Sequence, residues 1–155
     1  MAGSRSGIGI DSHRFAPGRP LILGGVEIPH DVGLSGHSDA DVLAHAIADA
    51  LLGAAGLGDI GQYFPDTDER WRDADSMQLL RHVVSLVEER GHRVEHVDAT
   101  VMLERPKLAP HRDAIRASLE AVLGSVNVKA TTGEGMGFVG RGEGAAALAV
   151  ATLVD

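Results

Sequence analysis

In IGIDSH, residues 8–13, every second position is Ile8, Ile10 and Ser12, and the positions between them are Gly9, Asp11 and His13. A period of two predicts a β-strand. Asp11 and His13 stand two residues apart on it, so their side chains leave the same face and could converge on one ion. A D-x-H pair is common, and by itself it is weak evidence for a metal site.

Apolar periodicity, glycine and proline divide the rest of the chain into further elements. The sequence predicts a hairpin of 21–23 and 26–28 around Gly24-Gly25, a helix over about 41–54 capped by Ser38 or Asp39, a mobile loop over 61–74, a helix from Asp75 or Ser76 to Gly91, a strand over 94–103, a helix from Pro110 to Gly124, and strands over 126–130 and 145–154.

The resulting order is β-β-β-α-α-β-α-β-β, which predicts one α/β (α+β) domain over 1–155 with a mixed sheet and helices packed on one face. The last strand, 145–154, consists almost entirely of small and apolar residues. We expect it to make the sheet pack against other subunits, although a buried central strand would have the same composition.

Composition excludes several classes of protein. The formal net charge is −8, which argues against a general nucleic-acid surface. No apolar run reaches the roughly 18 residues of a membrane span, and MAGSRSG at the start lacks the apolar segment of a signal peptide, so we expect a soluble, cytoplasmic protein. There is no cysteine, so a metal would be held by His, Asp and Glu.

The first predicted helix carries a polar stripe beside its apolar face. Asp41, His45 and Asp49 lie at i, i+4 and i+8. His45 could join Asp11 and His13 on one ion, leaving the open coordination position that is typical of catalytic zinc. The alternative is a solvated helix face.

Two further segments suit an anionic ligand. His37-Ser38-Asp39 precedes the first helix, where backbone N–H groups attract phosphate, although His37 could be an ordinary loop residue. TTGEGMGFVGRGEG at 131–144 lets backbone amides approach a ligand, but it matches neither the P-loop nor the dinucleotide spacing and could be a flexible connection. The only two lysines, Lys107 and Lys129, are candidates for local positive charge.

Five blocks in order resemble the 2-C-methyl-D-erythritol 2,4-cyclodiphosphate synthase family, the ring-closing enzymes of the non-mevalonate isoprenoid pathway. They are DSH at 11–13, HSDADVLAH at 37–45, GDIGQYFPDTD at 58–68, ERPKLAPH at 104–111 and VKATTGEGMGFVGRGEG at 128–144. The resemblance implies a phosphorus-oxygen lyase that converts 4-diphosphocytidyl-2-C-methyl-D-erythritol 2-phosphate to the cyclic diphosphate and CMP. It also implies a homotrimer with sheets facing its axis and active sites between subunits.

The resemblance assigns roles by matching position. Asp11, His13 and His45 would bind Zn²⁺, Glu134 would hold a second ion, Mg²⁺ or Mn²⁺, and His37 and Thr132 would stabilise the transition state. Substrate contacts would come from Asp11, Ser12, His13, His37 and Ser38; from Asp59, Ile60, Gly61, Phe64, Pro65, Asp66, Thr67 and Asp68; from Leu103, Glu104, Arg105, Pro106, Lys107, Leu108 and Ala109; from Ala130, Thr131, Thr132, Gly133 and Glu134; and from Phe138 and Arg141 near the trimer axis.

Departures from the family pattern are small. Ala40 stands where a glycine is common, and Gly133 and Gly135 loosen the loop that carries Glu134. Two other functions remain open: a zinc phosphohydrolase that activates water, and a non-catalytic trimeric protein that binds an isoprenoid along its axis.

Overall fold

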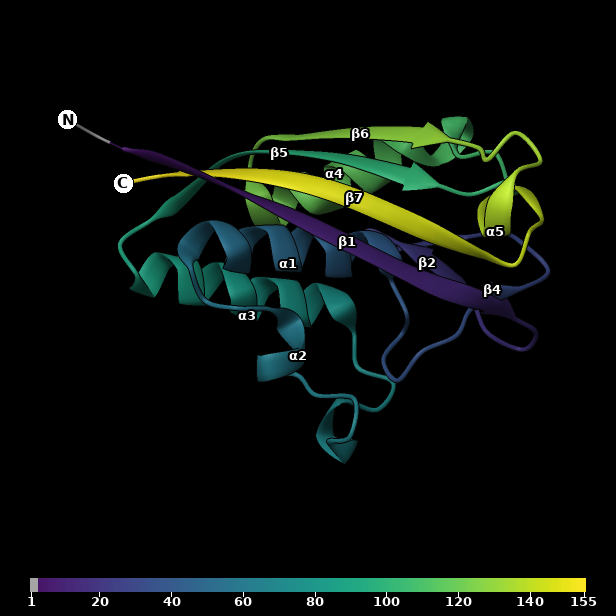
Figure 1. The fold of residues 1–155 in the computed structure, drawn as a ribbon, viewed down its shortest axis with the longest axis horizontal. Helices are drawn as coiled ribbons and strands as arrows, with labels where there is room; N and C mark the ends of the chain where they lie inside the picture. The colour runs from purple at the N-terminus through teal and green to yellow at the C-terminus, as the bar shows by residue number, and fades with distance from the viewer. Residues whose placement is uncertain (1–2) are drawn as a thin grey trace.

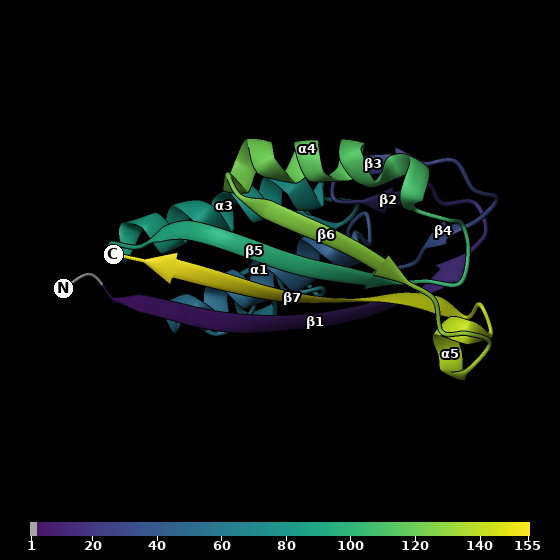
Figure 2. The same cartoon turned by 90° about the horizontal axis from the view of Figure 1, so that it is seen from above.

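The computed structural model describes residues 3–155, and its centre is a five-stranded mixed sheet (Figures 1 and 2). The strand order is β4-β1-β7-β5-β6, in which β5 and β6 are parallel and the other pairs are antiparallel. The strands are β1 (Ser4–Ala16), β4 (Gly33–Leu34), β5 (Arg93–Met102), β6 (Val126–Thr131) and β7 (Gly144–Val154). A mixed sheet was predicted, and the apolar last strand lies at its centre.

Three long helices cover one face of this sheet, as the sequence predicts (Figure 1). They are α1 (Val42–Ala55), α3 (Ser76–Glu89) and α4 (Arg112–Leu123). Nearly every residue of α1 is buried, because the helix packs on β1 and β7 on one side and on α3 on the other. Its leucines and Ile47 form the middle of the hydrophobic core.

Two glycines let α1 lie directly against β1. A Cβ atom at Gly9 would stand 1.8 Å from the carbonyl oxygen of Ala46, and one at Gly7 would stand 2.1 Å from that of Ala50. Real Cβ atoms do not come this close, so any larger residue would push the helix away. The alternation of glycine and isoleucine in β1 thus sets the distance between the strand and the helix.

A buried carboxylate joins α1 to the predicted hairpin of β2 (Leu21–Leu23) and β3 (Val26–Ile28). Asp41 accepts hydrogen bonds from the backbone N–H groups of Gly24 and Gly25, at 2.9 and 2.8 Å, and from that of Ala44, at 3.0 Å. Both glycines have positive φ, as a two-residue turn requires. Burial raises the pKa of Asp41 to about 6, against the lowering effect of these N–H groups.

The N-cap of α1 is therefore Asp41. The prediction of Ser38 or Asp39 was wrong, because the carboxylate three residues before Ala44 is the one that reaches both the first turn and the hairpin. Asp41 is also fully buried, with both carboxylate oxygens occupied by backbone N–H groups, and it is not one of the side chains that come together at the metal centre.

The other face of the sheet carries apolar side chains that no helix of residues 3–155 covers. Ile8 and Ile10 are each 62% exposed, and their cross-strand partners Val150 and Leu148 are 47% and 38% exposed. Farther across the same face, Lys129 forms an ion pair with Asp98 at 2.8 Å. One face of the sheet therefore packs into the hydrophobic core. The other face is exposed, with apolar side chains on β1 and β7 and an ion pair on β5 and β6.

The predicted irregular loops contain short elements. Residues 61–74, expected to be irregular, include most of α2 (Ile60–Tyr63) and all of η1 (Glu69–Trp71), and the glycine-rich segment contains α5 (Gly137–Gly140). The third long helix begins at Arg112, because Pro110 lies in a preceding 3₁₀ turn, η2 (Ala109–His111). Within residues 3–155, no helix combines the length and the hydropathy needed to cross a membrane.

Candidate metal centre

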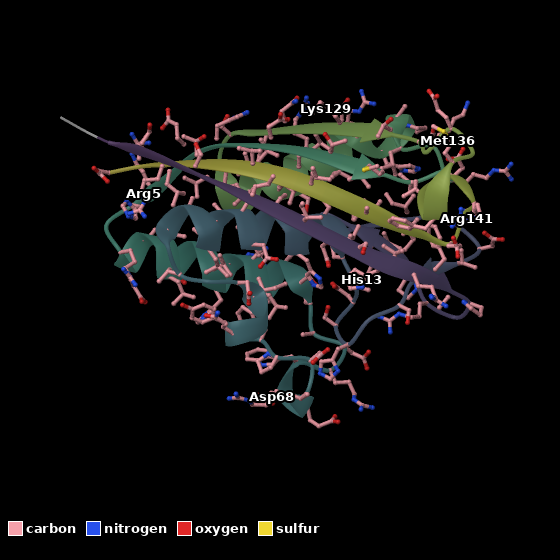
Figure 3. The ribbon with its side chains drawn as sticks, viewed as in Figure 1. Arg5, His13, Asp68, Lys129, Met136 and Arg141 are labelled. Carbon is pink, nitrogen blue, oxygen red and sulfur yellow. The ribbon has the colours of Figure 1, made fainter. Side chains whose placement is uncertain are left out.

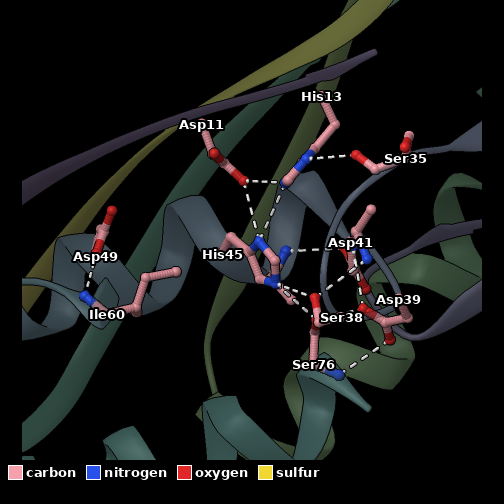
Figure 4. A network of polar contacts seen from close by, with 12 residues as sticks. Asp11, His13, Ser35, Ser38, Asp39, Asp41, His45, Asp49, Ile60 and Ser76 are labelled. Carbon is pink, nitrogen blue, oxygen red and sulfur yellow. Dashed lines mark hydrogen bonds and ion pairs between the residues drawn. The ribbon is translucent and has the colours of Figure 1, made fainter. Parts of the chain in front are cut away.

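The three predicted zinc ligands meet between β1 and α1. The Oδ2 atom of Asp11 lies 2.8 Å from Nε2 of His13 and 3.1 Å from Nδ1 of His45, and the two ring nitrogens are 3.3 Å apart (Figure 4). Among residues 3–155, no other group of three His, Asp, Glu or Cys side chains comes together closely enough to share one metal ion. The close contact at Gly9, two residues before Asp11, brings His45 within this reach.

These atoms fit a tetrahedral zinc ion. Zinc binds imidazole nitrogen and carboxylate oxygen at about 2.0–2.2 Å, so two ligand atoms of a tetrahedron lie about 3.3 Å apart. The three observed separations, 2.8 to 3.3 Å, are close to that edge. Three protein ligands leave a fourth position open, as catalytic zinc sites do.

Hydrogen bonds on the far side of each ring point the correct nitrogen at this centre. Nδ1 of His13 lies 3.0 Å from the carbonyl oxygen of Ser35, which accepts a hydrogen bond from Nδ1–H and leaves Nε2 free. Nε2 of His45 lies 2.8 Å from the hydroxyl of Ser76 and 3.1 Å from that of Ser38, which leaves Nδ1 free. Both rings are thus held in the tautomer that a metal requires.

The charge of the site is also suited to a cation. Burial would raise the pKa of Asp11, but hydrogen bonds and attraction from His13 and His45 outweigh it and lower the pKa to about 2. Burial lowers the pKa of His45, but the hydrogen bond to Asp11 and the negative charges of Asp11, Asp41 and Asp39 together outweigh it, and the net shift is upward. Both shifts favour a negative charge on Asp11 and a positive charge beside it.

The three ligands line a pocket of about 520 Å³. The other predicted site residues in its wall are His37, Ser38, Ile60, Gly61, Phe64, Pro65 and Asp66. Sequence reasoning missed Gly36, Trp71 and Leu79. Trp71 could have been suspected, since it is the only tryptophan and stands in a polar segment; its ring meets that of Phe64 edge to face at 4.9 Å between centroids.

His37 ties this pocket to the segment that follows α2. Its Nε2 lies 2.9 Å from the carbonyl oxygen of Asp68, and its own carbonyl accepts the N–H of Asp73 at 2.8 Å. The side chain of Asp68 is used locally, because it caps η1 and pairs with Arg70, whose guanidinium lowers its pKa.

A second, smaller pocket of about 190 Å³ lies at the carboxyl ends of β5 and β6. It is lined by nine of the predicted residues, Leu103, Glu104, Pro106, Lys107, Leu108, Ala109, Ala130, Thr131 and Thr132, and by Arg112, which the sequence did not single out. Glu104 also accepts the N–H of Gly133 at 2.9 Å, which holds the glycine-rich loop beside this pocket.

The remaining predicted residues lie apart from both pockets. Ser12 and Phe138 line a hollow of about 210 Å³, and Arg105 and Arg141 line a separate pocket of about 460 Å³. Asp59 caps α2, while Thr67, Asp68, Gly133 and Glu134 are not in the walls of these four pockets. Lys129 points from the exposed face and pairs with Asp98, so its suggested role as local charge for a ligand is not supported in this chain (Figure 3).

Comparisons with known proteins agree with the geometry. The YgbB family model matches residues 4–154. The 2-C-methyl-D-erythritol 2,4-cyclodiphosphate synthase of Salinibacter ruber is 61% identical over 153 residues, covering 96% of this chain and 98% of that protein. The bifunctional IspDF of Campylobacter jejuni superposes with a TM-score of 0.95 at 44% identity, covering 99% of this chain and 43% of that one. A 2C-methyl-D-erythritol-2,4-cyclodiphosphate synthase in a CDP-bound form has a TM-score of 0.88 at 44% identity, covering 97% of this chain and all of that one. The chain belongs to the YgbB family.

Proposed function

We propose that this protein converts 4-diphosphocytidyl-2-C-methyl-D-erythritol 2-phosphate to 2-C-methyl-D-erythritol 2,4-cyclodiphosphate and CMP. The observation that carries the proposal is the Asp11, His13 and His45 cluster at the wall of an open pocket, in a chain 61% identical to a protein of that name. The cluster matches the requirement of a reaction that brings two phosphates together.

The reaction forms one P–O bond and breaks another. An oxygen of the 2-phosphate attacks the β-phosphorus, and the bond from that phosphorus to the oxygen bridging to the α-phosphate breaks, so that CMP leaves with the electron pair. The attacking phosphate is already ionised at neutral pH, so no general base is needed. The barrier lies mainly in anion repulsion and alignment.

The residues of the pocket suit these needs. A zinc ion on Asp11, His13 and His45 would supply positive charge to the diphosphate. His37 lies on the same wall; as an imidazolium it would keep its Nε2–H on the carbonyl oxygen of Asp68 and offer Nδ1–H to a phosphate oxygen. Phe64 and Trp71 exclude water from one side. Zinc in the first site and Mg²⁺ or Mn²⁺ with Glu134 complete the proposed cofactors.

We infer a homotrimer with composite active sites. The metal pocket and the β5–β6 pocket are separate in one chain, yet the substrate has a methylerythritol end and a cytidine end. The uncovered strip of Ile8, Ile10, Leu148 and Val150 supports burial of this face against other copies around an axis. Such packing would let the β5–β6 pocket of one subunit, with Thr132, receive the cytidine of a substrate held by the metal pocket of another. The CDP-bound form of a structural neighbour supports a cytidine ligand.

The proposal includes the location and extent of the enzyme. Residues 1–155 act as one synthase domain, a phosphorus-oxygen lyase in the cytoplasm, without nucleic-acid or membrane partners.

Product analysis tests this function. The protein is incubated with the cytidine diphosphate substrate, Zn²⁺ and Mg²⁺, and the products are examined by ³¹P NMR and mass spectrometry. We expect the cyclic diphosphate and CMP in equal amounts, with no ¹⁸O taken up from labelled water. Linear phosphates carrying ¹⁸O would instead identify a zinc phosphohydrolase, and no turnover would favour a binding protein.

Two variants connect the products with the proposed metals. His45→Ala should lose zinc and CMP release while the trimer persists, since two ligands cannot fix the ion's geometry. Glu134→Gln should need more Mg²⁺ for half-maximal rate, because it removes a charged oxygen ligand. Normal turnover in the first variant, or an unchanged Mg²⁺ titration in the second, would contradict the corresponding role.

A further inference from the structure

A buried serine connects the metal centre to a carboxylate that is not one of its ligands. Ser76, at the start of α3, is 1% exposed. Its hydroxyl lies 2.8 Å from Nε2 of His45 on one side and contacts Oδ1 of Asp39 on the other (Figure 4). The three groups come from separate parts of the chain and form a line that ends at the metal centre.

The chemistry of these groups fixes the direction of the hydrogen bonds. The ionised carboxylate of Asp39 can only accept, so the Ser76 hydroxyl donates to it. The lone pairs of Ser76 then remain for the N–H at Nε2 of His45. A proton held at Nε2 leaves Nδ1 as the metal-binding nitrogen, on the side of Asp11.

Asp39 is itself held firmly. Its Oδ2 accepts the N–H of Ser76 at 3.0 Å, its Oδ1 accepts the N–H of Asp41 at 3.1 Å, and its own N–H donates to the carbonyl of Ala74 at 3.0 Å. No Lys or Arg of residues 3–155 forms an ion pair with it. Its negative charge therefore acts through Ser76 and strengthens the hydroxyl as an acceptor.

Ser38 offers a natural comparison. Its hydroxyl also approaches Nε2 of His45, but at 3.1 Å, and it accepts the N–H of Ala40 at 3.2 Å. It lies 3.4 Å from the hydroxyl of Ser76 and has no hydrogen bond to a carboxylate of residues 3–155. Nε2 of His45 therefore lies closer to the hydroxyl of Ser76, which donates to the Asp39 carboxylate, than to the hydroxyl of Ser38, which does not.

We propose that Ser76 and Asp39 are positioning residues that hold His45 in the Nε2–H tautomer and aim its Nδ1 at the metal. This inference rests on the proposed metal site at Asp11, His13 and His45. Residues that hold a metal-binding histidine from behind typically change metal affinity by about 10- to 100-fold when they are removed. A purely structural role, in which Ser76 only joins α3 to α1, would change unfolding but not metal affinity.

The test compares zinc affinity in Ser76→Ala, Ser38→Ala and the wild type, by competition with a chromophoric chelator, and checks folding by urea denaturation. We expect Ser76→Ala to lose about 10- to 100-fold in affinity, and Ser38→Ala to lose less than about threefold. With Co²⁺ in place of Zn²⁺, the visible absorption of Ser76→Ala should shift, because that absorption reports ligand geometry.

Equal zinc affinity and an unchanged cobalt spectrum in folded Ser76→Ala would overturn the inference. If Ser76→Ala does not fold, Asp39→Asn decides, since it keeps the Ser76 hydroxyl and removes the charge of its partner. Urea denaturation shows separately the cost of the backbone hydrogen bond that the amide nitrogen cannot accept. In the folded variant, a loss of zinc affinity of about fivefold or more supports the inference, and wild-type affinity overturns it. A wild type that binds no zinc would refute the metal site of the proposed function instead, so the two failures are distinguishable.

Discussion

Replacing Gly9 by alanine should disrupt the metal centre by pushing α1, which carries His45, away from β1. The new Cβ would stand 1.8 Å from the carbonyl oxygen of Ala46, whereas ordinary contact begins at 3.4 Å. Helix α1 (Val42–Ala55) must therefore move from β1 by about 1.6 Å, because the obstacle is helix backbone and not a flexible side chain. His45 precedes Ala46 and moves with it.

The displacement is large compared with the tolerance of a metal site. Ligands must keep their positions within about 0.5 Å, so the separation of His45 from Asp11 and His13 would become too wide for one zinc ion. We expect Gly9→Ala to lower zinc affinity by more than about tenfold and the free energy of unfolding by about 1–3 kcal/mol. Chelator competition and urea denaturation measure the two effects.

Gly53→Ala is the matched control. Gly53 lies in α1, on the opposite side of the same helix–strand contact, and its replacement adds the same methyl group. The atoms nearest to the new Cβ, in Gly7 and Ile8, stand 3.9 Å away. We expect it to raise the free energy of unfolding by about 0.5–1 kcal/mol, since alanine favours a helix over glycine, and to leave zinc affinity unchanged. If Gly9→Ala bound zinc as tightly as Gly53→Ala, the argument that the glycines set the position of His45 would be wrong.

Three other perturbations have definite expected results. Burial raises the pKa of Asp49 above 3.8, so the folded state holds the carboxyl proton more tightly than the unfolded state does. The free energy of unfolding therefore falls as the pH rises above 3.8. Asp49→Asn should remove this pH dependence, measured by urea denaturation at several pH values. Asp49 now accepts the N–H of Ile60 at 2.8 Å, and the amide oxygen of Asp49→Asn can still accept it. Asp49→Ala cannot, so its free energy of unfolding should be lower by about 1 kcal/mol. Equal stability of the two variants would contradict the role of that bond. Ile10→Glu should dissociate the proposed trimer in sedimentation velocity while Ile10→Val does not, because the glutamate puts a charge into the apolar strip; a trimeric glutamate variant would exclude this face as the interface. Zinc at 100 times its Kd should stabilise the folded protein by about 2.7 kcal/mol, and a chelator should reverse the rise in Tm; a Tm that ignores both would argue against a specific site.

Periodicity in the sequence predicted the long elements of this fold well. The strand at Ile8 and the helix at His45 follow repeats of two and of about four residues, and packing against the core preserves such repeats; the last strand is indicated by its run of apolar residues instead. The short elements α2, α5 and β4 are two to four residues long, too short for any period to show. Contacts with distant residues decide them.

In the candidate site too, some residues could be predicted from the sequence, whereas others are decided by contacts with distant residues. Residue type and spacing placed Asp11, His13 and His45 among the possible ligands, and the fold brings their ligand atoms together. The capping carboxylate of α1 could not be chosen from sequence, because Asp41 is selected by the N–H groups of Gly24 and Gly25, which are distant along the chain. Composition likewise gave no reason to connect position 76 with a histidine 31 residues earlier.

The most direct test of the metal centre is an anomalous difference map, recorded at the zinc edge, from crystals grown with zinc. We expect one peak in every copy of the chain, bonded to Oδ2 of Asp11, Nε2 of His13 and Nδ1 of His45. Zinc bound only at other residues, with no peak among these three atoms, would contradict the account.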